Sequence, residues 1–326
     1  MNFLWITVQR VGYAAILLFA VLVLNFALMH LAPGDIADTI AGDMGGADAE
    51  VMAEIRRSYG LDLPVWEQLI KYLGGVLHFD LGYSFYFNTP VVTLLLERVP
   101  ATLLLVVAAQ ILAISVGVLL GVIAARQPNG MASHVVTLIA LFGFSAPVFW
   151  TGIMLLITFS LWVPIFPVAG MQDVTIDGNW FERMLDVGRH LVLPVITLAS
   201  VFLALYSRLC RASMLEVLGS DYIRTARAKG LSTREVVVKH ALKNALNPVV
   251  TLAGLQFSAV VSGAVLVETV FSWPGLGTLA LQSIIARDTP TILGILFFSA
   301  LVVVVANLLT DLVLRMIDPR IRSGDS

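Results

Sequence analysis

The sequence predicts an all-α, polytopic membrane protein, and three observations lead to that prediction. Hydrophobic residues make up 58% of the 326 residues and charged residues only 13%, against roughly 45–50% and about 25% in ordinary globular chains. The mean hydropathy of +0.90 requires much of the apolar surface to face lipid rather than water. Six apolar stretches are long enough for membrane helices, which need about 20 residues each.

The six predicted spans are apolar around the whole helix, as lipid-embedded helices are. They cover residues 11–32, 102–125, 135–163, 190–207, 249–271 and 291–314. The first is too long for the apolar region of a cleaved signal and is interpreted as a retained span. In the third, the run Ser145, Ala146 and Pro147 predicts a break, because proline kinks or ends a helix.

Lysine and arginine predict that both ends of the chain lie in the cytoplasm, since basic loops stay on that side. With the N-terminus inside, the inner segments hold 13 basic and 6 acidic residues, and the outer segments 7 basic and 16 acidic residues. The net charge of −2 therefore hides a strong asymmetry between the two faces.

These spans predict four parts of the chain. They are an N-terminal cytoplasmic end with the first span (1–32), an extracytoplasmic insertion (33–100), a five-helix core (101–318) with a basic loop at 208–248, and a cytoplasmic tail (319–326). Within the insertion, residues 51–59 and 65–77 have helical spacing, with Gly60 as a stop and Pro64 as a start. The insertion is either a solvated acidic loop or a docked lid, and its many aromatic residues favour the lid.

The basic loop at 208–248 carries its own helix signals. Ser220 or Asp221 can cap a helix that runs to Lys229, and Gly230 suits the left-handed position after a helix end. Residues 232–235 (Ser-Thr-Arg-Glu) are a capping-box sequence that opens a second helix. We expect that helix to end near Leu246, before Pro248.

The second helix of the loop is expected to place Val238, Ala241, Leu242 and Ala245 on one side. Two interpretations of the loop remain open: a basic segment that only sets orientation, or a rigid elbow that transmits force from a soluble partner. The glycine-centred pair of capped helices favours the elbow, because a passive tether needs no caps.

Residues 221–231 and 240–248 resemble the cytoplasmic loop of ATP-binding-cassette importer permeases, and more narrowly the dipeptide/oligopeptide/nickel branch. Further matches, which extend the resemblance over essentially the whole chain, lie at 32–35, 60–62, 80–84, 99–102, 268–277 and 314–322. Each motif is weak alone, and their order and spacing carry the resemblance.

The resemblance implies a type I importer permease in a bacterial inner (plasma) membrane. It would pair with a second homologous permease subunit, most simply as a heterodimer, with two cytoplasmic ATPases that bind ATP and Mg, and with an extracytoplasmic binding protein. The implied substrates are di- or oligopeptides. Nickel, a metal chelate or another small solute of the same family is the alternative.

The resemblance also implies an ATPase-docking role for the elbow. The residues concerned are Asp221, Arg224, Thr225, Ala226, Arg227, Gly230 and Leu231. The general permease motif opens with Glu-Ala-Ala, whereas this chain has Arg224, Thr225 and Ala226. A salt bridge to the ATPase would therefore need another acid, and Asp221 or Glu235 can supply one.

Enzymatic chemistry within this chain is not expected. It contains no Gly-x-x-x-x-Gly-Lys-Ser/Thr phosphate loop, no His-Glu-x-x-His zinc motif and only one cysteine, Cys210, so we expect no cofactor or metal in the chain itself. A secondary transporter is the alternative class. Such proteins hold ionisable residues at mid-membrane, whereas His30, Glu268 and Asp311 fall toward span ends, and Asp311 has Arg315 at i+4 as a local partner.

Polar residues inside the spans are the candidates for the translocation pathway. We single out Gln110, Ser145, Gln256, Ser262 and Glu268. The alternative is a purely structural role, because serine often bonds its own helix backbone and small residues promote helix packing. Glu268 can equally support a structured outer turn that contains Trp273 and Pro274.

Overall fold

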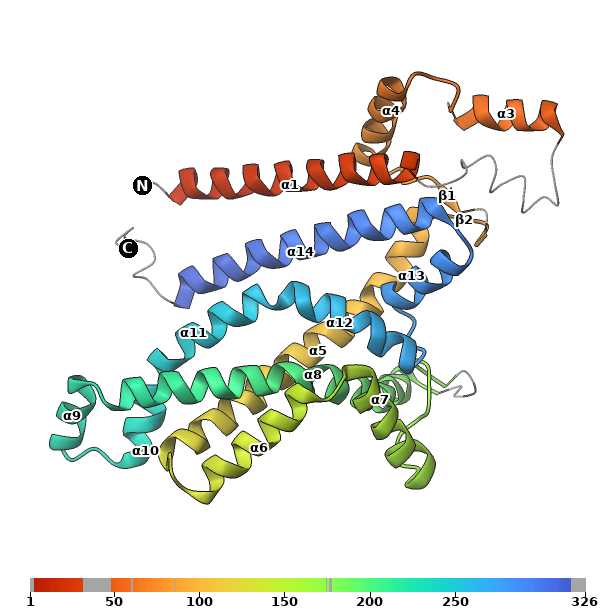
Figure 1. Cartoon of the computed structure of the whole chain (residues 1–326). Helices are drawn as coiled ribbons and strands as arrows, with labels where there is room; N and C mark the ends of the chain where they lie inside the picture. The colour runs from red at the N-terminus through yellow and green to blue at the C-terminus, as the bar shows by residue number, and fades with distance from the viewer. Residues whose placement is uncertain are drawn as a thin grey trace. The chain divides into compact units, whose positions relative to one another are not determined.

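A computed structural model describes residues 3–31, 48–59, 61–84, 86–173, 175 and 178–317, and almost all of its regular structure is helical (Figure 1). Four helices in this part are long and apolar enough to cross a membrane: α1 (Phe3–Leu31), α5 (Val91–Arg126), α8 (Trp180–Leu218) and α14 (Thr289–Ile317). A fifth candidate is the pair α11 (Leu242–Leu255) and α12 (Phe257–Val270), bent by 56°. The all-α class is confirmed.

The third predicted span is divided in two. Helix α6 (Met131–Ser145) ends at the predicted break, and α7 (Val148–Leu156) begins after Pro147 and continues into a π-helical segment, η1 (Ile157–Trp162). Proline lacks a backbone N–H and disfavours helical geometry in the residue before it, which separates the two helices here. Each half is shorter than a complete span.

Contacts divide the chain into two compact units, Met1–Pro100 with Gly275–Val305, and Ala101–Pro274 with Ala306–Ser326. The first unit contains α1, α3 (Ala49–Tyr59), α4 (Val65–Leu77), a hairpin of β1 (Tyr83–Ser84) and β2 (Thr89–Pro90), and α13 (Leu276–Ile285). Helices α5 and α14 contribute residues to both units.

The two helices predicted in the insertion are confirmed, and Pro64 stands directly before α4. Helix α4 packs on α1 through a small apolar cluster that contains Val76, Leu22 and Phe297. The hairpin is attached to the start of α14 by a buried carboxylate: the hydroxyls of Ser84 and Thr291 donate to Asp288 Oδ2 at 2.5 and 2.6 Å. Helix α4 and the hairpin are therefore packed rather than parts of a free solvated loop.

The second unit is organised around α8, which packs against α6, α7, α11 and α12 (Figure 1). Its apolar core includes Leu198, Tyr206 and Met214 of α8, all essentially inaccessible to solvent. Helix α5 approaches α8 closely at Gly117 and Gly121. A Cβ atom at Gly121 would lie 2.7 Å from Cys210 Cβ and 2.8 Å from Ser207 O, so these glycines at i and i+4 permit the contact between backbones.

The expected end of the elbow's second helix is wrong. After α9 (Asp221–Ala228), the short helix α10 (Thr233–Glu235) leads through a π-helical segment, η2 (Val236–Ala241), directly into α11, which carries Pro248 in its interior. A transmembrane helix tolerates such a proline where neighbouring groups and local π geometry satisfy the freed backbone.

The prediction that Val238 lies on the apolar face is also wrong. Its side chain is 57% exposed, whereas Val237, Ala241 and Ala245 are buried. Val238 lies within the π-helical segment, whose wider turn changes the direction of its side chains relative to an ideal α-helix. Several predicted features lie outside the described residues: Gly60, the 32–35 motif, the side chains of Asp311 and Arg315, and the chain from 318 onward.

Candidate coupling elbow and translocation residues

The first helix of the elbow, α9, presents a polar outer face and an apolar inner face. Ile223 and Ala226 are buried, whereas Arg224, Thr225 and Arg227 are exposed. Ser220 occupies the N-cap position, but its hydroxyl donates to Val217 O at 2.6 Å instead of capping. Of the predicted docking residues, Ala226 therefore holds the helix against the core, and the charged residues are available to a partner.

The turn that ends α9 depends on Gly230. Its φ is +80°, the left-handed region predicted from the sequence, and its N–H donates to Arg227 O at 3.0 Å. A Cβ atom at this position would meet nothing within 4 Å. Glycine is required here for backbone conformation and not for space. Leu231, the next residue, is half-buried.

The predicted capping box at Ser232 is confirmed. Glu235 N donates to Ser232 Oγ at 3.3 Å, and Ser232 N donates to Glu235 Oε2 at 3.2 Å. The Ser232 hydroxyl also donates to Glu235 Oε2 at 2.8 Å, and these side-chain and backbone hydrogen bonds lower the pKa of the Glu235 carboxyl. The carboxylate is thus engaged within the turn, and Asp221 bonds Arg224 at 3.3 Å.

A hydrogen bond that sequence reasoning missed links the two arms of the elbow. Asn244 Nδ2 donates to Tyr222 Oη at 2.8 Å, joining α11 to α9. The two residues are 22 positions apart, and no local pattern indicates their contact. With the glycine turn and the capping box, this bond gives the elbow a defined shape (Figure 1).

Gln110 lies in the core of the second unit. It is 9% exposed, and its Nε2 donates to Tyr206 Oη at 2.8 Å and to Ala253 O at 3.1 Å. Its Oε1 is buried without a hydrogen-bond partner. The sequence analysis named Gln110 as a candidate for the translocation pathway; in the structure its hydrogen-bond partners are a tyrosine of α8 and a backbone carbonyl of α11.

Gln256, Ser262 and Ser145 remain accessible in the structure. Gln256 is half-buried and lies at the bend, where it is both the C-cap residue of α11 and the N-cap residue of α12. Ser262 on α12 and Ser145 at the end of α6 are exposed. The two serines therefore lie on different helices: Ser262 belongs to the bent pair α11–α12, and Ser145 belongs to the broken pair α6–α7.

Glu268 is completely buried, and Thr102 Oγ1 donates to its Oε1 at 2.6 Å. The turn after α12 is attached to the same stretch of α5: Trp273 N donates to Glu268 O at 2.8 Å, and Trp273 Nε1 donates to Ala101 O at 2.8 Å. Of the two alternatives for Glu268, this geometry favours support of a structured turn.

A second polar cluster, also missed from the sequence, lies at the start of α8. His190 and Asp186 are both 8% exposed, with Nδ1 and Oδ1 separated by 3.3 Å. Asp173 N donates to Asp186 Oδ2 at 2.7 Å, so the cluster attaches the preceding loop to the helix. Hydrogen bonds from Thr175 lower the pKa of the Asp173 carboxyl.

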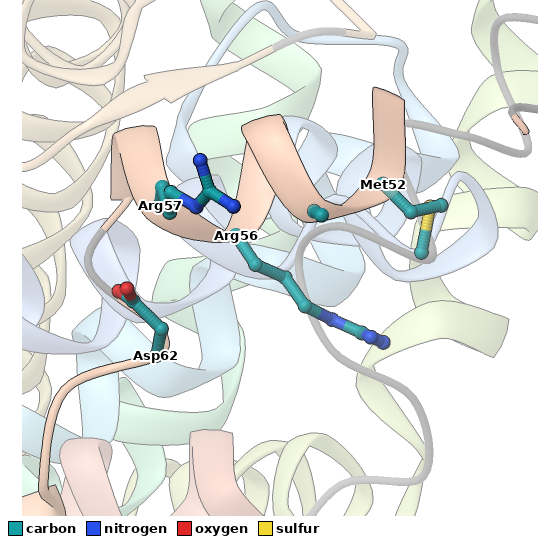
Figure 2. Close-up of a pocket in the computed structure, with 5 residues that line it drawn as sticks. Met52, Arg56, Arg57 and Asp62 are labelled. Atoms are coloured by element: carbon teal, nitrogen blue, oxygen red, sulfur yellow. The ribbon is translucent and has the colours of Figure 1, made fainter. Parts of the chain in front are cut away.

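Hollows occur among the described residues of the first unit. One of about 460 Å³ is bounded by Met52, Ala53, Arg56 and Arg57 of α3 and by Asp62 on the segment after it (Figure 2). Another, of about 200 Å³, lies among α1, α4 and the start of α14, with Lys71 and Asp80 among its lining residues. Neither is lined by a predicted translocation residue. Within the described residues, no group of three His, Cys, Asp or Glu side chains could hold a metal ion.

Long apolar helices, one broken helix pair and one bent helix pair together define an all-α, multi-helix membrane protein. A solved structure of the MetNI methionine ABC transporter in an inward-facing conformation matches the fold with a TM-score of 0.54 at 18% identity, covering 69% of this chain and 96% of that one.

Residues 117–323 match the family described as binding-protein-dependent transport system inner membrane component, and residues 2–106 match the N-terminal model of that system's membrane components. The dipeptide transport system permease protein DppB of Escherichia coli K12 is 40% identical over 331 residues, covering 96% of this chain and 97% of the relative. The oligopeptide transport system permease protein AppB of Bacillus subtilis 168 is 38% identical over 317 residues, with 96% and 98% covered.

The chain belongs to the family of binding-protein-dependent transport system inner membrane components. It is a multi-pass inner-membrane permease of the ABC type, in a family whose members lack ATPase activity and work with ATPase and binding-protein partners. The family resemblance, the membrane location and the non-enzymatic role expected from the sequence are confirmed.

Proposed function

We propose that this permease carries di- or oligopeptides into the cell, taking them from an extracytoplasmic binding protein. Similarity over nearly the whole length to dipeptide and oligopeptide permeases supports this substrate class, since 96% of the chain aligns with each. The pathway requires two halves, and we propose a second, homologous permease subunit as the other half of a heterodimer. Two ATPase subunits would bind ATP and Mg and supply the energy.

The proposed topology has six spans with both ends in the cytoplasm. Helices α6 and α7 would together form the third span, and the four parts 1–32, 33–100, 101–318 and 319–326 would follow from it. The charge asymmetry supports this arrangement, because 13 of the 20 basic residues fall in the inner segments.

The chain's single cysteine makes this topology easy to test, because Cys210 is buried. Asp62→Cys should react with a membrane-impermeant maleimide added to intact spheroplasts. Ala228→Cys should react only after the membrane is permeabilised. Labelling of Ala228→Cys from outside would reject the orientation.

We further propose that α9 docks on one ATPase through its exposed face, with Asp221, Arg224, Thr225 and Arg227 as the contact residues. Ala226 and Leu231 would hold the helix against the core, and Gly230 would fix the direction of the turn that follows it. The exposure of the polar face, together with the capped turn and the Tyr222–Asn244 bond, supports a preformed docking element, which loses less conformational entropy on binding.

For the pathway, we propose Ser145, Gln256 and Ser262 as lining residues. All three are accessible; Ser145 and Gln256 lie at the interruptions of two predicted spans, and Ser262 lies further along α12. Interrupted helices are a common way to expose backbone and polar groups inside a membrane. The burial and bonding of Glu268 favour a structural role.

The decisive experiment is reconstitution of the complete complex in proteoliposomes with its binding protein. We expect dipeptide-loaded binding protein to stimulate ATP hydrolysis and to drive peptide uptake that survives a protonophore. Uptake that continues without ATP and stops with the protonophore would reject ATP-driven import. Uptake of nickel or a chelate in place of peptide would reject the proposed substrate class.

A further inference from the structure

The bend between α11 and α12 interrupts the backbone hydrogen bonding of a predicted membrane span. The two helices differ in direction by 56° around Gln256. The last four carbonyls of a helix have no partner within it, and in lipid an unpaired carbonyl is costly. At this bend, Gln256 N donates to Leu252 O at 2.9 Å. The carbonyl of Ala253, the next residue, needs another donor.

Gln110 of α5 supplies that donor. Its Nε2 lies 3.1 Å from Ala253 O and 2.8 Å from Tyr206 Oη. One amide group thus joins three helices, α5, α8 and α11, at the point where the span changes direction. The residues are 143 and 96 positions apart in the chain, so the connection is entirely tertiary.

Packing next to the bend restricts it from another side. A Cβ atom at Gly254 would collide with Thr310 of α14, so α14 lies directly against the last turn of α11. Ala253 and Gly254 are both buried. The position of this turn is therefore set by neighbouring helices on both sides.

The elbow and the bend belong to one helical stretch. From Ser232, α10, η2 and α11 follow each other without interruption to Leu255, and α9 is attached to α11 through the Tyr222–Asn244 bond. A displacement of α9 can therefore reach, along α11, the bend that Gln110 contacts.

The same amide leaves Oε1 buried and without a partner in this conformation. An unpaired buried acceptor destabilises the state that contains it. The Oε1 atom therefore does not help to hold the bend, and the two hydrogen bonds of Nε2 carry the connection.

We propose that Gln110 is a positioning residue for transport: it holds the α11–α12 bend through Ala253 O and Tyr206 and makes the bend the pivot between the elbow and α12, without contacting the peptide. The proposal rests on the ATP-driven import proposed above. It also reassigns Gln110, which the sequence alone placed among the pathway candidates, because both of its amide hydrogens face protein acceptors.

The test compares Gln110→Met, which keeps the size of the side chain but removes the donor, with Gln110→His, which retains one N–H. In the reconstituted complex we expect Gln110→Met to lower peptides transported per ATP by about tenfold, with the KM for peptide-loaded binding protein unchanged. Loss of a hydrogen bond to a buried carbonyl has consequences of about this size. Gln110→His should recover part of the loss.

Tyr206→Phe should have a smaller effect, and adding it to Gln110→Met should cause no further loss, since both changes act on one hydrogen-bonded group. Ser115→Ala, at an exposed position of the same helix, is the matched control and should behave as wild type.

A structural readout separates this proposal from the proposed function. Spin labels at Lys243→Cys and Leu266→Cys, on the two arms of the bend, report its angle in the purified complex without transport. We expect one narrow distance distribution in the wild type and a broadened or shifted one in Gln110→Met. An unchanged distribution, or a raised KM and altered peptide preference, would overturn the proposal. Failure of the wild-type complex to transport would instead reject the proposed function.

Discussion

Replacement of Gly230 tests how the elbow is built, because the structure separates two reasons for a glycine. The φ of +80° places this residue in the left-handed region, while a Cβ atom there would meet nothing within 4 Å. The cost of a side chain is therefore conformational. Left-handed geometry costs about 1–2 kcal/mol for an ordinary L-residue, less for asparagine and more for a β-branched residue.

The loss of ATPase affinity should be smallest in Gly230→Asn, larger in Gly230→Ala and largest in Gly230→Val, although asparagine is larger than alanine. If the docking conformation of the elbow becomes less populated, affinity for the ATPase falls in proportion. A penalty of about 1.4 kcal/mol corresponds to at most a tenfold rise in Kd. Gly230→Asn should stay within about threefold of wild type, and Gly230→Val should exceed about tenfold.

The assay is the Kd of the purified ATPase for the permease in detergent or nanodiscs, with membrane insertion and thermal stability as controls. All three variants should insert normally, because the residue lies outside the spans. Damage that follows side-chain size, with Gly230→Asn worse than Gly230→Ala, would refute the conformational explanation. Equal affinity in all variants would show that the turn does not contribute to docking.

Three further predictions concern local contacts. Gly121→Leu should separate α5 from α8 and lower the thermal stability of the permease by several degrees, because a Cβ atom would already lie 2.7 Å from Cys210 Cβ. Leu119→Ala, at an exposed position of the same helix, is the control. Equal thermal stability of the two variants would contradict this packing. Tyr222→Phe should weaken ATPase binding by about threefold to fivefold through loss of one hydrogen bond of about 1 kcal/mol, and Asn244→Ala should give the same loss without adding to it. The pKa of Glu235 is lowered from its ordinary value of 4.5 by its bonds with Ser232. The capping box should therefore be intact above 4.5 and be lost as pH falls through the lowered pKa of the folded protein; hydrogen exchange at residues 232–235 should show this acid transition in the wild type and not in Glu235→Gln.

The elbow was largely predictable because its signals are local. Gly230 and the Ser232–Glu235 capping box act within a few residues of themselves, and both have the predicted geometry. The break at Pro147 was also predictable from a local signal, because the ring of a proline disturbs the helix only in its own turn and at the residue before it.

Prediction failed where neighbouring helices override local preference. Pro248 does not end its helix, and the π turn before it rotates Val238 outward. Nothing in the composition around residues 236–241 indicates the wider turn, because an α-helix and a π turn are built from the same residues and differ in the packing that they satisfy.

Composition, hydropathy and the positions of lysine and arginine were sufficient to assign a helical membrane protein, because the free energy of transfer between water and lipid is set mainly by the type of residue. Partnership between distant polar groups depends on how the helices come together. Only the tertiary structure joins Gln110 to Ala253 across 143 residues and buries Glu268 against Thr102 across 166, since a buried polar group takes whichever partner the packing brings within 3 Å or so.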